Sequence, residues 1–153
     1  MYEYNCKLVK VVDGDTIDID IDLGFDTILK NQRVRLAGID TPESRTRDAE
    51  EKKYGFAAKK FLQEYLWKMN PNHDLILRTT EYDAKGKFGR ILGEVFNLYG
   101  SQPIKQKEPS VSANQALIEN HHAVAYHGAS KEDIEAGHLL NREFVDLEEI
   151  TND

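Results

Sequence analysis

The sequence predicts an α+β fold, a small five-stranded β-barrel with three α-helices. Residues 16–23 alternate apolar and acidic side chains without a break, which is typical of a half-buried strand. Residues 51–69 carry apolar side chains at helical spacing, and the segments before and after them read as strands. The resulting order, β-β-β-α-β-β-α-α, is that of an OB-type barrel.

The first three predicted strands form a meander. Residues 4–12 are rich in β-branched side chains and give the first strand, and Asp13-Gly14-Asp15 makes a turn. Residues 16–23 are the second strand. After a turn at residues 23–26, residues 27–36 give the third, so the amphipathic strand lies in the middle of the three.

The remaining predicted elements follow the helix at residues 51–69. The last of them is a helix at residues 131–149. We expect it to pack through its apolar side chains, which are Ile134, Leu139, Leu140, Phe144 and Leu147. The elements are strands at 74–82 and 88–96 with a hairpin turn at 83–87, a long exposed loop at 97–110, and helices at 112–122 (capped by Ser112) and 131–149.

Composition limits the cellular locations and the binding partners that the chain can have. The formal net charge is -7, but residues 129–153 hold most of the excess acid, so local clusters decide what the body of the chain binds. Cys6 is the single cysteine, which excludes an internal disulfide. No segment reaches the length of a membrane span, and the first residues do not resemble a secretory signal. We therefore expect no membrane partner and a cytoplasmic protein, or a secreted one if a signal has been removed.

We expect a single domain over residues 1–153. Its core should cover about residues 4–145, followed by the acidic C-terminal end, and the chain should be a monomer.

Asp15 is the first candidate functional residue, because it precedes the alternating apolar and acidic residues of the second strand. It lies on the same face as the core-facing Ile17, Ile19 and Ile21, where a lone buried carboxylate is costly. We therefore expect Asp15 at the barrel rim beside a compensating cation. The competing interpretation is a turn aspartate that only caps backbone amides, since Asp-Gly turns are common.

A second acidic pair follows the third strand, in R-V-R-L-A-G-I-D-T-P-E at residues 33–43. Asp40 and Glu43 stand where Pro42 ends regular structure, and carboxylates with a backbone carbonyl suit a hard cation such as Ca²⁺. Arg35 and Arg90 could supply paired donors to a phosphate. Taken alone, Asp-Thr-Pro-Glu is also a frequent turn or helix start, and single arginines are often surface ion-pair members.

Other polar residues receive structural interpretations. Asp18, Asp20 and Asp22 form the opposite, solvated face of the second strand, and D-G-D-T-I-D fails as an EF-hand because Asp18 replaces the required glycine. His121 and His122 are neighbours that point about 100° apart on a helix, so we expect surface histidines and not a shared metal site. Cys6 is expected to be a small core or edge residue.

Four motifs together resemble the staphylococcal nuclease (thermonuclease) family over about residues 8–144. They occur in order with compatible spacing, and K-Y-G at 53–55 fits the start of the family's first helix. The motifs are V-V-D-G-D-T at 11–16, R-L-A-G-I-D-T-P-E at 35–43, K-F-G-R at 87–90 and A-V-A-Y at 123–126.

The resemblance implies a five-stranded OB-type barrel with three helices, and a calcium-dependent endonuclease. Such a phosphodiesterase hydrolyses DNA and RNA, with single-stranded or frayed substrates preferred, by attack of water on phosphorus. It cuts the P–O5′ bond and leaves 3′-phosphate and 5′-hydroxyl ends. The alternative is a non-catalytic OB-type module that binds nucleic acid or protein, but such copies should lose the acidic and arginine residues that this chain retains.

Roles for individual residues also follow from the resemblance. For Ca²⁺ it implies the carboxylates of Asp15 and Asp40, the backbone carbonyl of Thr41, and Asp13 in an outer shell. The other implied roles are Glu43 as the base or the group that orders the attacking water, Arg35 and Arg90 on the scissile phosphate, Lys87 on the neighbouring 3′-phosphate, and Tyr126 beside the sugar or base.

Two positions depart from the family pattern. Phe88 stands where the family often has tyrosine, which removes a phenolic hydrogen bond to the 3′-phosphate. Gly128 stands where a second aromatic residue would follow Tyr126, so the nucleotide pocket should be incomplete on that side.

Overall fold

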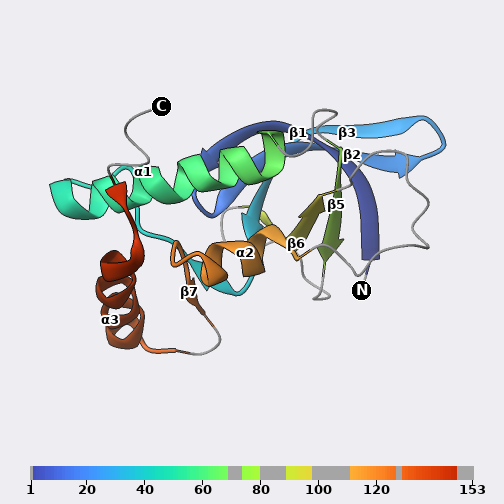
Figure 1. Cartoon of the computed structure of the whole chain (residues 1–153). Coiled ribbons are helices and arrows are strands. Elements are labelled where there is room, and N and C mark those ends of the chain that lie inside the picture. Colours follow the sequence, from blue (N-terminus) through green and yellow to red (C-terminus); the bar gives the residue numbers. More distant parts are fainter. Residues whose placement is uncertain (1, 69–73, 80–88, 98–110, 127–128, 148–153) are drawn as a thin grey trace.

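Five strands close into a barrel in this computed structural model, which describes residues 2–68, 74–79, 89–97, 111–126 and 129–147 (Figure 1). The order around the barrel is β1–β2–β3–β6–β5, and all pairs are antiparallel except β3 with β6. The predicted α+β barrel is therefore confirmed. The strands are β1 (Tyr2–Asp13), β2 (Thr16–Gly24), β3 (Thr27–Leu36), β5 (Asp74–Thr79) and β6 (Ile91–Asn97).

Strand β2 shows how the alternating pattern specifies the barrel. Ile17 and Ile19 are completely buried in the core, as the alternation predicts. The prediction that Asp18 lies on a solvated face is wrong, because this residue is only 8% exposed. Arg33 lies directly opposite it on β3, and its Nε and Nη2 donate to the two Asp18 oxygens at 3.0 and 3.2 Å. A cross-strand cation thus covers this carboxylate, whereas Asp22 is exposed as predicted.

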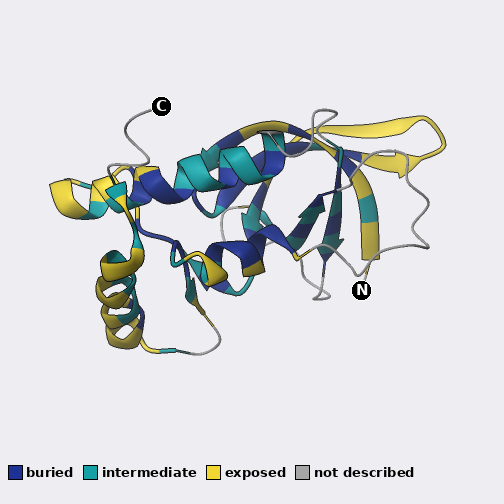
Figure 2. Ribbon diagram, in the orientation of Figure 1, coloured by how far each residue is buried: buried dark blue, intermediate teal, exposed yellow. Residues whose placement is uncertain are grey.

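Helix α1 (Ala49–Gln63) packs against the barrel and continues into a π-helical turn, η1 (Glu64–Lys68). It begins two residues earlier than predicted, because the Asp48 carboxylate accepts hydrogen bonds from the amides of Glu50 and Glu51. Figure 2 shows its buried face turned to the barrel, where Ala57, Ala58 and Leu62 lie. The two alanines are small enough to let the helix approach closely, and Leu62 is completely buried beside them.

Helix α2 (Ala113–Glu119) is capped by Ser112 as predicted, through a bond from the Gln115 amide to Ser112 Oγ. Its buried Asn114 fixes the neighbouring strands. The Asn114 Nδ2 donates to the Ala37 carbonyl at 2.8 Å, and its Oδ1 accepts from the Val95 amide at 3.2 Å. The helix thereby holds β6 beside the segment that follows β3.

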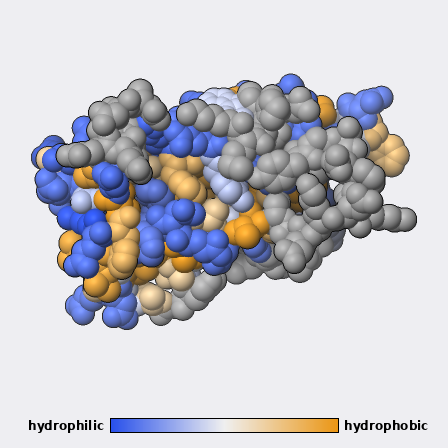
Figure 3. All heavy atoms as spheres, viewed as in Figure 1, coloured by the Kyte–Doolittle hydropathy of each residue, from blue (hydrophilic) through white to orange (hydrophobic). Residues whose placement is uncertain are grey.

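Helix α3 (Lys131–Asn141) and the 3₁₀ turn η4 (Arg142–Phe144) correct the prediction for residues 131–149. Leu139, Leu140 and Phe144 were expected to pack, but each is more than half exposed, and Figure 3 shows hydrophobic residues at the surface over this region. Ile134 is buried, and the face it shares with Gly137 and Asn141 is the one that docks. The three exposed side chains lie off that narrow face.

A two-stranded ladder outside the barrel joins two distant motifs. Strand β4 (Ile39–Asp40) pairs with β7 (Val124–Ala125), and the Tyr126 amide donates to the Gly38 carbonyl at 2.7 Å. These strands were not predicted. They bring the D-T-P-E corner and the A-V-A-Y motif side by side.

Several sequence predictions fall outside the described residues. They include the turn at 83–87, nearly all of the 97–110 loop, Lys87, Phe88 and Gly128. Within the described ranges, no helix has the length and apolarity to cross a membrane.

Candidate active site

A guanidinium group joins two carboxylates at the rim of the barrel. Arg35 Nη2 lies 3.5 Å from Asp15 Oδ2 and 3.5 Å from Asp40 Oδ1. The register of β2 and β3 produces the first contact, since Thr16 pairs with Arg35 and the Leu36 amide donates to the Asp15 carbonyl at 2.8 Å. Strand β4, which follows β3 after a short turn, produces the second.

Asp15 occupies the position that its parity predicted, at the rim beside a cation. Burial raises its pKa, and the nearby carboxylates of Asp13 and Asp40 raise it further. The Arg35 charge and a hydrogen bond from Thr16 Oγ1, at 2.9 Å, act in the opposite direction. Because burial is the largest effect, Asp15 is a carboxylate that would gain from further positive charge.

Asp40 has a second partner that sequence reasoning missed. Its Oδ2 lies 2.8 Å from Nε2 of His138, and the His138 side chain is only 12% exposed. A carboxylate only accepts hydrogen bonds, so Nε2 is the donor. His138 is 98 residues from Asp40 in the sequence and belongs to no motif, so no local pattern could reveal this contact.

Asp13 and Glu43 flank this cluster. Asp13 Oδ1 accepts from the Gly14 amide at 2.9 Å and from Ser44 Oγ at 2.8 Å, which ties the D-G-D turn to the loop after Pro42. The Glu43 side chain is exposed, and its amide lies 3.4 Å from Glu51 Oε1. Asp13 therefore braces the loop that carries Glu43.

Gly55 on α1 sets the position of that loop. A Cβ at this residue would lie 2.4 Å from the carbonyl carbon and oxygen of Glu43 and 2.5 Å from the Ser44 nitrogen. Only a residue without a side chain permits this approach. The K-Y-G motif therefore has a physical reason, because it places the helix directly against the Glu43 backbone.

An open cleft of about 680 Å³ lies beside the cluster. Arg35, Leu92, Gln115 and Tyr126 are among its lining residues, and Tyr126 is half exposed. Arg90 immediately precedes β6, whose first residue, Ile91, pairs with Val34. The structure joins Asp15, Arg35 and Asp40 by direct contacts, and Tyr126 lines the cleft together with Arg35. Arg90 is located by the register of β6 alone, and Lys87 lies outside the described residues.

The adjacent histidines behave differently from each other. His121 stacks on Phe144, with ring centroids 4.4 Å apart, whereas His122 is buried beside Phe61 at 4.9 Å. The predicted surface position is therefore wrong for His122. Burial and the neighbouring His121 lower the pKa of His122 to about 4, so its ring is neutral at physiological pH.

Comparison with known proteins identifies the family. The family model described as "Staphylococcal nuclease homologue" matches residues 33–145. The chain belongs to this family. It is similar to a thermonuclease of Staphylococcus intermedius (42% identical over 57% of this chain and 45% of the relative) and to one of Staphylococcus hyicus (34% identical over 61% and 49%). It is also similar to endonuclease YhcR of Bacillus subtilis strain 168, at 29% identity over 81% of this chain.

The matched relatives are longer proteins. The chain spans less than half the length of the two thermonucleases and 9% of the endonuclease. The family match includes three of the four motifs, those at 35–43, 87–90 and 123–126, and supports the predicted resemblance and fold.

The donor set fits a hard divalent cation that keeps several waters. Among the described residues, no three His, Cys, Asp or Glu side chains are grouped closely enough to hold an ion by themselves. Two carboxylates and the backbone carbonyl of the buried Thr41 remain as oxygen donors. Burial is the main reason that the pKa of Asp15 is raised, and a bound cation would favour its charged form. The residues present therefore fit a hard divalent cation bound through oxygen atoms and water.

Proposed function

We propose that the chain is a Ca²⁺-dependent nuclease that hydrolyses phosphodiester bonds in DNA and RNA. The observation that carries the proposal is the Asp15–Arg35–Asp40 cluster beside an open cleft. An anion-binding guanidinium between two partly buried carboxylates suits a substrate that brings negative charge together with a bound cation.

The metal-binding residues in this proposal are Asp15, Asp40 and the Thr41 carbonyl. A bound Ca²⁺ ion supplies Lewis-acid charge to the phosphoryl oxygens. Asp13 supports the site from behind through its bond to Ser44, and the long 3.5 Å contacts of Arg35 leave its guanidinium able to turn to a phosphate.

The reaction proceeds by attack of water on phosphorus. Glu43, whose side chain is exposed three residues after Asp40, orders the water and accepts its proton. A new P–O bond forms while the P–O5′ bond breaks, and the leaving O5′ takes up a proton, which gives 3′-phosphate and 5′-hydroxyl ends. Arg35 and Arg90 stabilise the charge that develops on the equatorial oxygens.

The cleft accommodates the nucleotide next to the scissile phosphate. The half-exposed Tyr126 ring offers a surface for a sugar or base, and Lys87 is assigned to the neighbouring 3′-phosphate from its motif alone. Because stacking on Tyr126 needs an unpaired base, single-stranded or frayed substrates should be preferred.

End-group analysis tests the chemistry. A single-stranded oligonucleotide that carries a fluorophore at its 5′ end is digested in Ca²⁺, and the fragments are treated with a phosphatase, which leaves this label in place. Fragments that lose a 3′-phosphate and shift in mobility support the proposal. Fragments with 3′-hydroxyl ends would contradict the direction of cleavage, and tight binding without cleavage would favour a non-catalytic binding module.

A further inference from the structure

The contact between Asp40 and His138 links the last helix to the candidate metal site. The His138 Nε2 and Arg35 Nη2 groups contact opposite oxygens of the same carboxylate, at 2.8 Å to Oδ2 and 3.5 Å to Oδ1. The His138 contact is much the shorter of the two. It is therefore the stronger constraint on how the Asp40 carboxylate is rotated.

Burial of one ring nitrogen determines which tautomer of His138 is favoured. Its Nδ1 is buried and has no hydrogen-bond partner among the described residues. A proton on Nδ1 would leave an unsatisfied buried donor, so the favoured tautomer carries its proton on Nε2, toward Asp40. The hydrogen bond thus has a defined direction, from the ring to the carboxylate.

Close packing of α3 places His138 within reach. A Cβ at the preceding residue, Gly137, would lie 3.0 Å from both methyl groups of Val124 on β7. Asn141 Nδ2 donates to the Ala123 carbonyl at 3.2 Å, one turn further along the same face. Because Val124 pairs with Asp40, the helix that packs on β7 delivers its histidine to Asp40.

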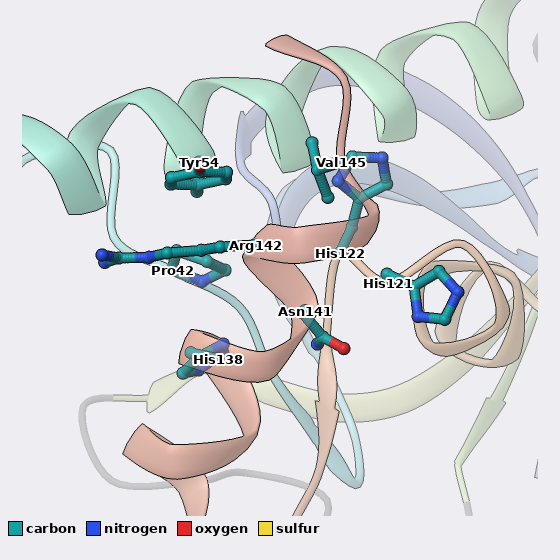
Figure 4. A pocket seen from close by; sticks show the side chains of 8 residues that line it. All are labelled: Pro42, Tyr54, His121, His122, His138, Asn141, Arg142 and Val145. Carbon is teal, nitrogen blue, oxygen red and sulfur yellow. The ribbon is translucent and has the colours of Figure 1, made fainter.

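The end of α3 is anchored to α1 as well. The Arg142 guanidinium lies over the Tyr54 ring, 5.0 Å from its centroid, and Figure 4 shows both beside Pro42 with His138 one turn below on α3. Contacts on both sides of His138 therefore fix the helix against the loop that carries Thr41 and Glu43.

We propose that His138 is a positioning residue that holds the Asp40 carboxylate in the orientation for binding Ca²⁺. The inference rests on the proposed function, because it needs Asp40 to be a metal ligand. A carboxylate has a broad torsional preference about its last bond, and Asp40 is about one-third exposed. A fixed donor on Oδ2 removes that freedom and leaves Oδ1 on the side of Arg35, whose Nη2 lies 3.5 Å away. Hydrogen-bond partners of this kind contribute about 10- to 100-fold in metal affinity.

Calorimetric titration with Ca²⁺ at fixed pH and ionic strength tests the inference without reference to turnover. His138→Ala should weaken Ca²⁺ binding by about 10- to 100-fold. His138→Gln keeps an N–H donor near the Nε2 position and should recover most of that loss. Leu140→Ala, on an exposed site of the same helix, is the matched control and should bind Ca²⁺ like the unmodified chain.

The Gln variant separates positioning from packing. If His138 only fills space in the α3 interface, Ala and Gln should change Ca²⁺ affinity in proportion to their loss of stability in urea. Equal Ca²⁺ affinity of the unmodified chain and His138→Ala would overturn this inference and leave the proposed metal site intact. Absence of Ca²⁺ binding by the unmodified chain would contradict the proposed metal site itself, and the inference with it.

Nitrogen NMR of the unmodified protein provides a readout that does not depend on a variant folding. The His138 ring should show a protonated Nε2 in the metal-free protein. An unprotonated Nε2 in the metal-free protein would contradict the hydrogen bond on which the inference is built.

Discussion

Gly55→Ala tests the claim that α1 positions the loop carrying Glu43. The added Cβ would lie 2.4 Å from the Glu43 carbonyl group, whereas contacting carbon atoms normally lie about 3.5 Å apart. The loop or the helix must therefore move by about 1 Å. A displacement of this size at a catalytic group costs about 100-fold in rate. Overpacking of a rigid site should also lower the free energy of unfolding by about 1–3 kcal/mol.

The sign of the change in unfolding free energy distinguishes a crowded site from an uncrowded one. A glycine in a helix interior is ordinarily about 0.5–1 kcal/mol less stable than alanine, so an uncrowded site would gain stability. Unfolding in urea and the rate of DNA cleavage in saturating Ca²⁺ should be measured for both proteins. Lys53→Ala, on the exposed side of α1, should change the unfolding free energy by no more than about 0.5 kcal/mol. A Gly55→Ala protein that is more stable and equally active would refute the reasoning.

Three further substitutions test the electrostatics. Arg35→Ala should lower turnover by about 100- to 1,000-fold, as loss of a group that stabilises developing charge does, and a near-normal rate would exclude the phosphate role. Asp15→Asn should raise the unfolding free energy of the metal-free protein, because it removes a buried charge beside two other carboxylates. Urea denaturation in chelator measures this change, and a lower unfolding free energy for the variant would contradict the prediction. His122 has a folded pKa of about 4 against an ordinary 6.5, so its contribution is present above pH 6.5 and is lost as the pH falls toward 4. That loss is about 3 kcal/mol, and His122→Leu should lack it when thermal unfolding is followed across this range.

The barrel could be predicted from the sequence because its signals are local. The unbroken alternation in β2 fixes which side chains face the core, and parity alone placed Asp15 at the rim beside a cation. The Asp48 and Ser112 caps are equally local, although the Asp48 cap moved the start of α1 by two residues. Where neighbouring residues determine the structure, the sequence was sufficient.

The rest depends on contacts between distant segments. Strands β4 and β7 contain two residues each, which is too short for any periodic pattern. Asp18 is covered by an arginine on the next strand, and His138 reaches Asp40 across 98 residues. The family resemblance supplied the roles of Asp40 and Glu43, but only the folded arrangement adds His138 to them.

The dependence of cleavage on free Ca²⁺ tests the central claim most directly, that the Asp15–Arg35–Asp40 cluster is a metal-dependent phosphodiesterase site. Heat-denatured DNA should be degraded at a rate that rises with Ca²⁺ and saturates. Addition of a chelator should stop the reaction, and restored Ca²⁺ should restart it, with Mg²⁺ run alongside for comparison. Undiminished cleavage in chelator, or no cleavage at any Ca²⁺ concentration, would contradict the account.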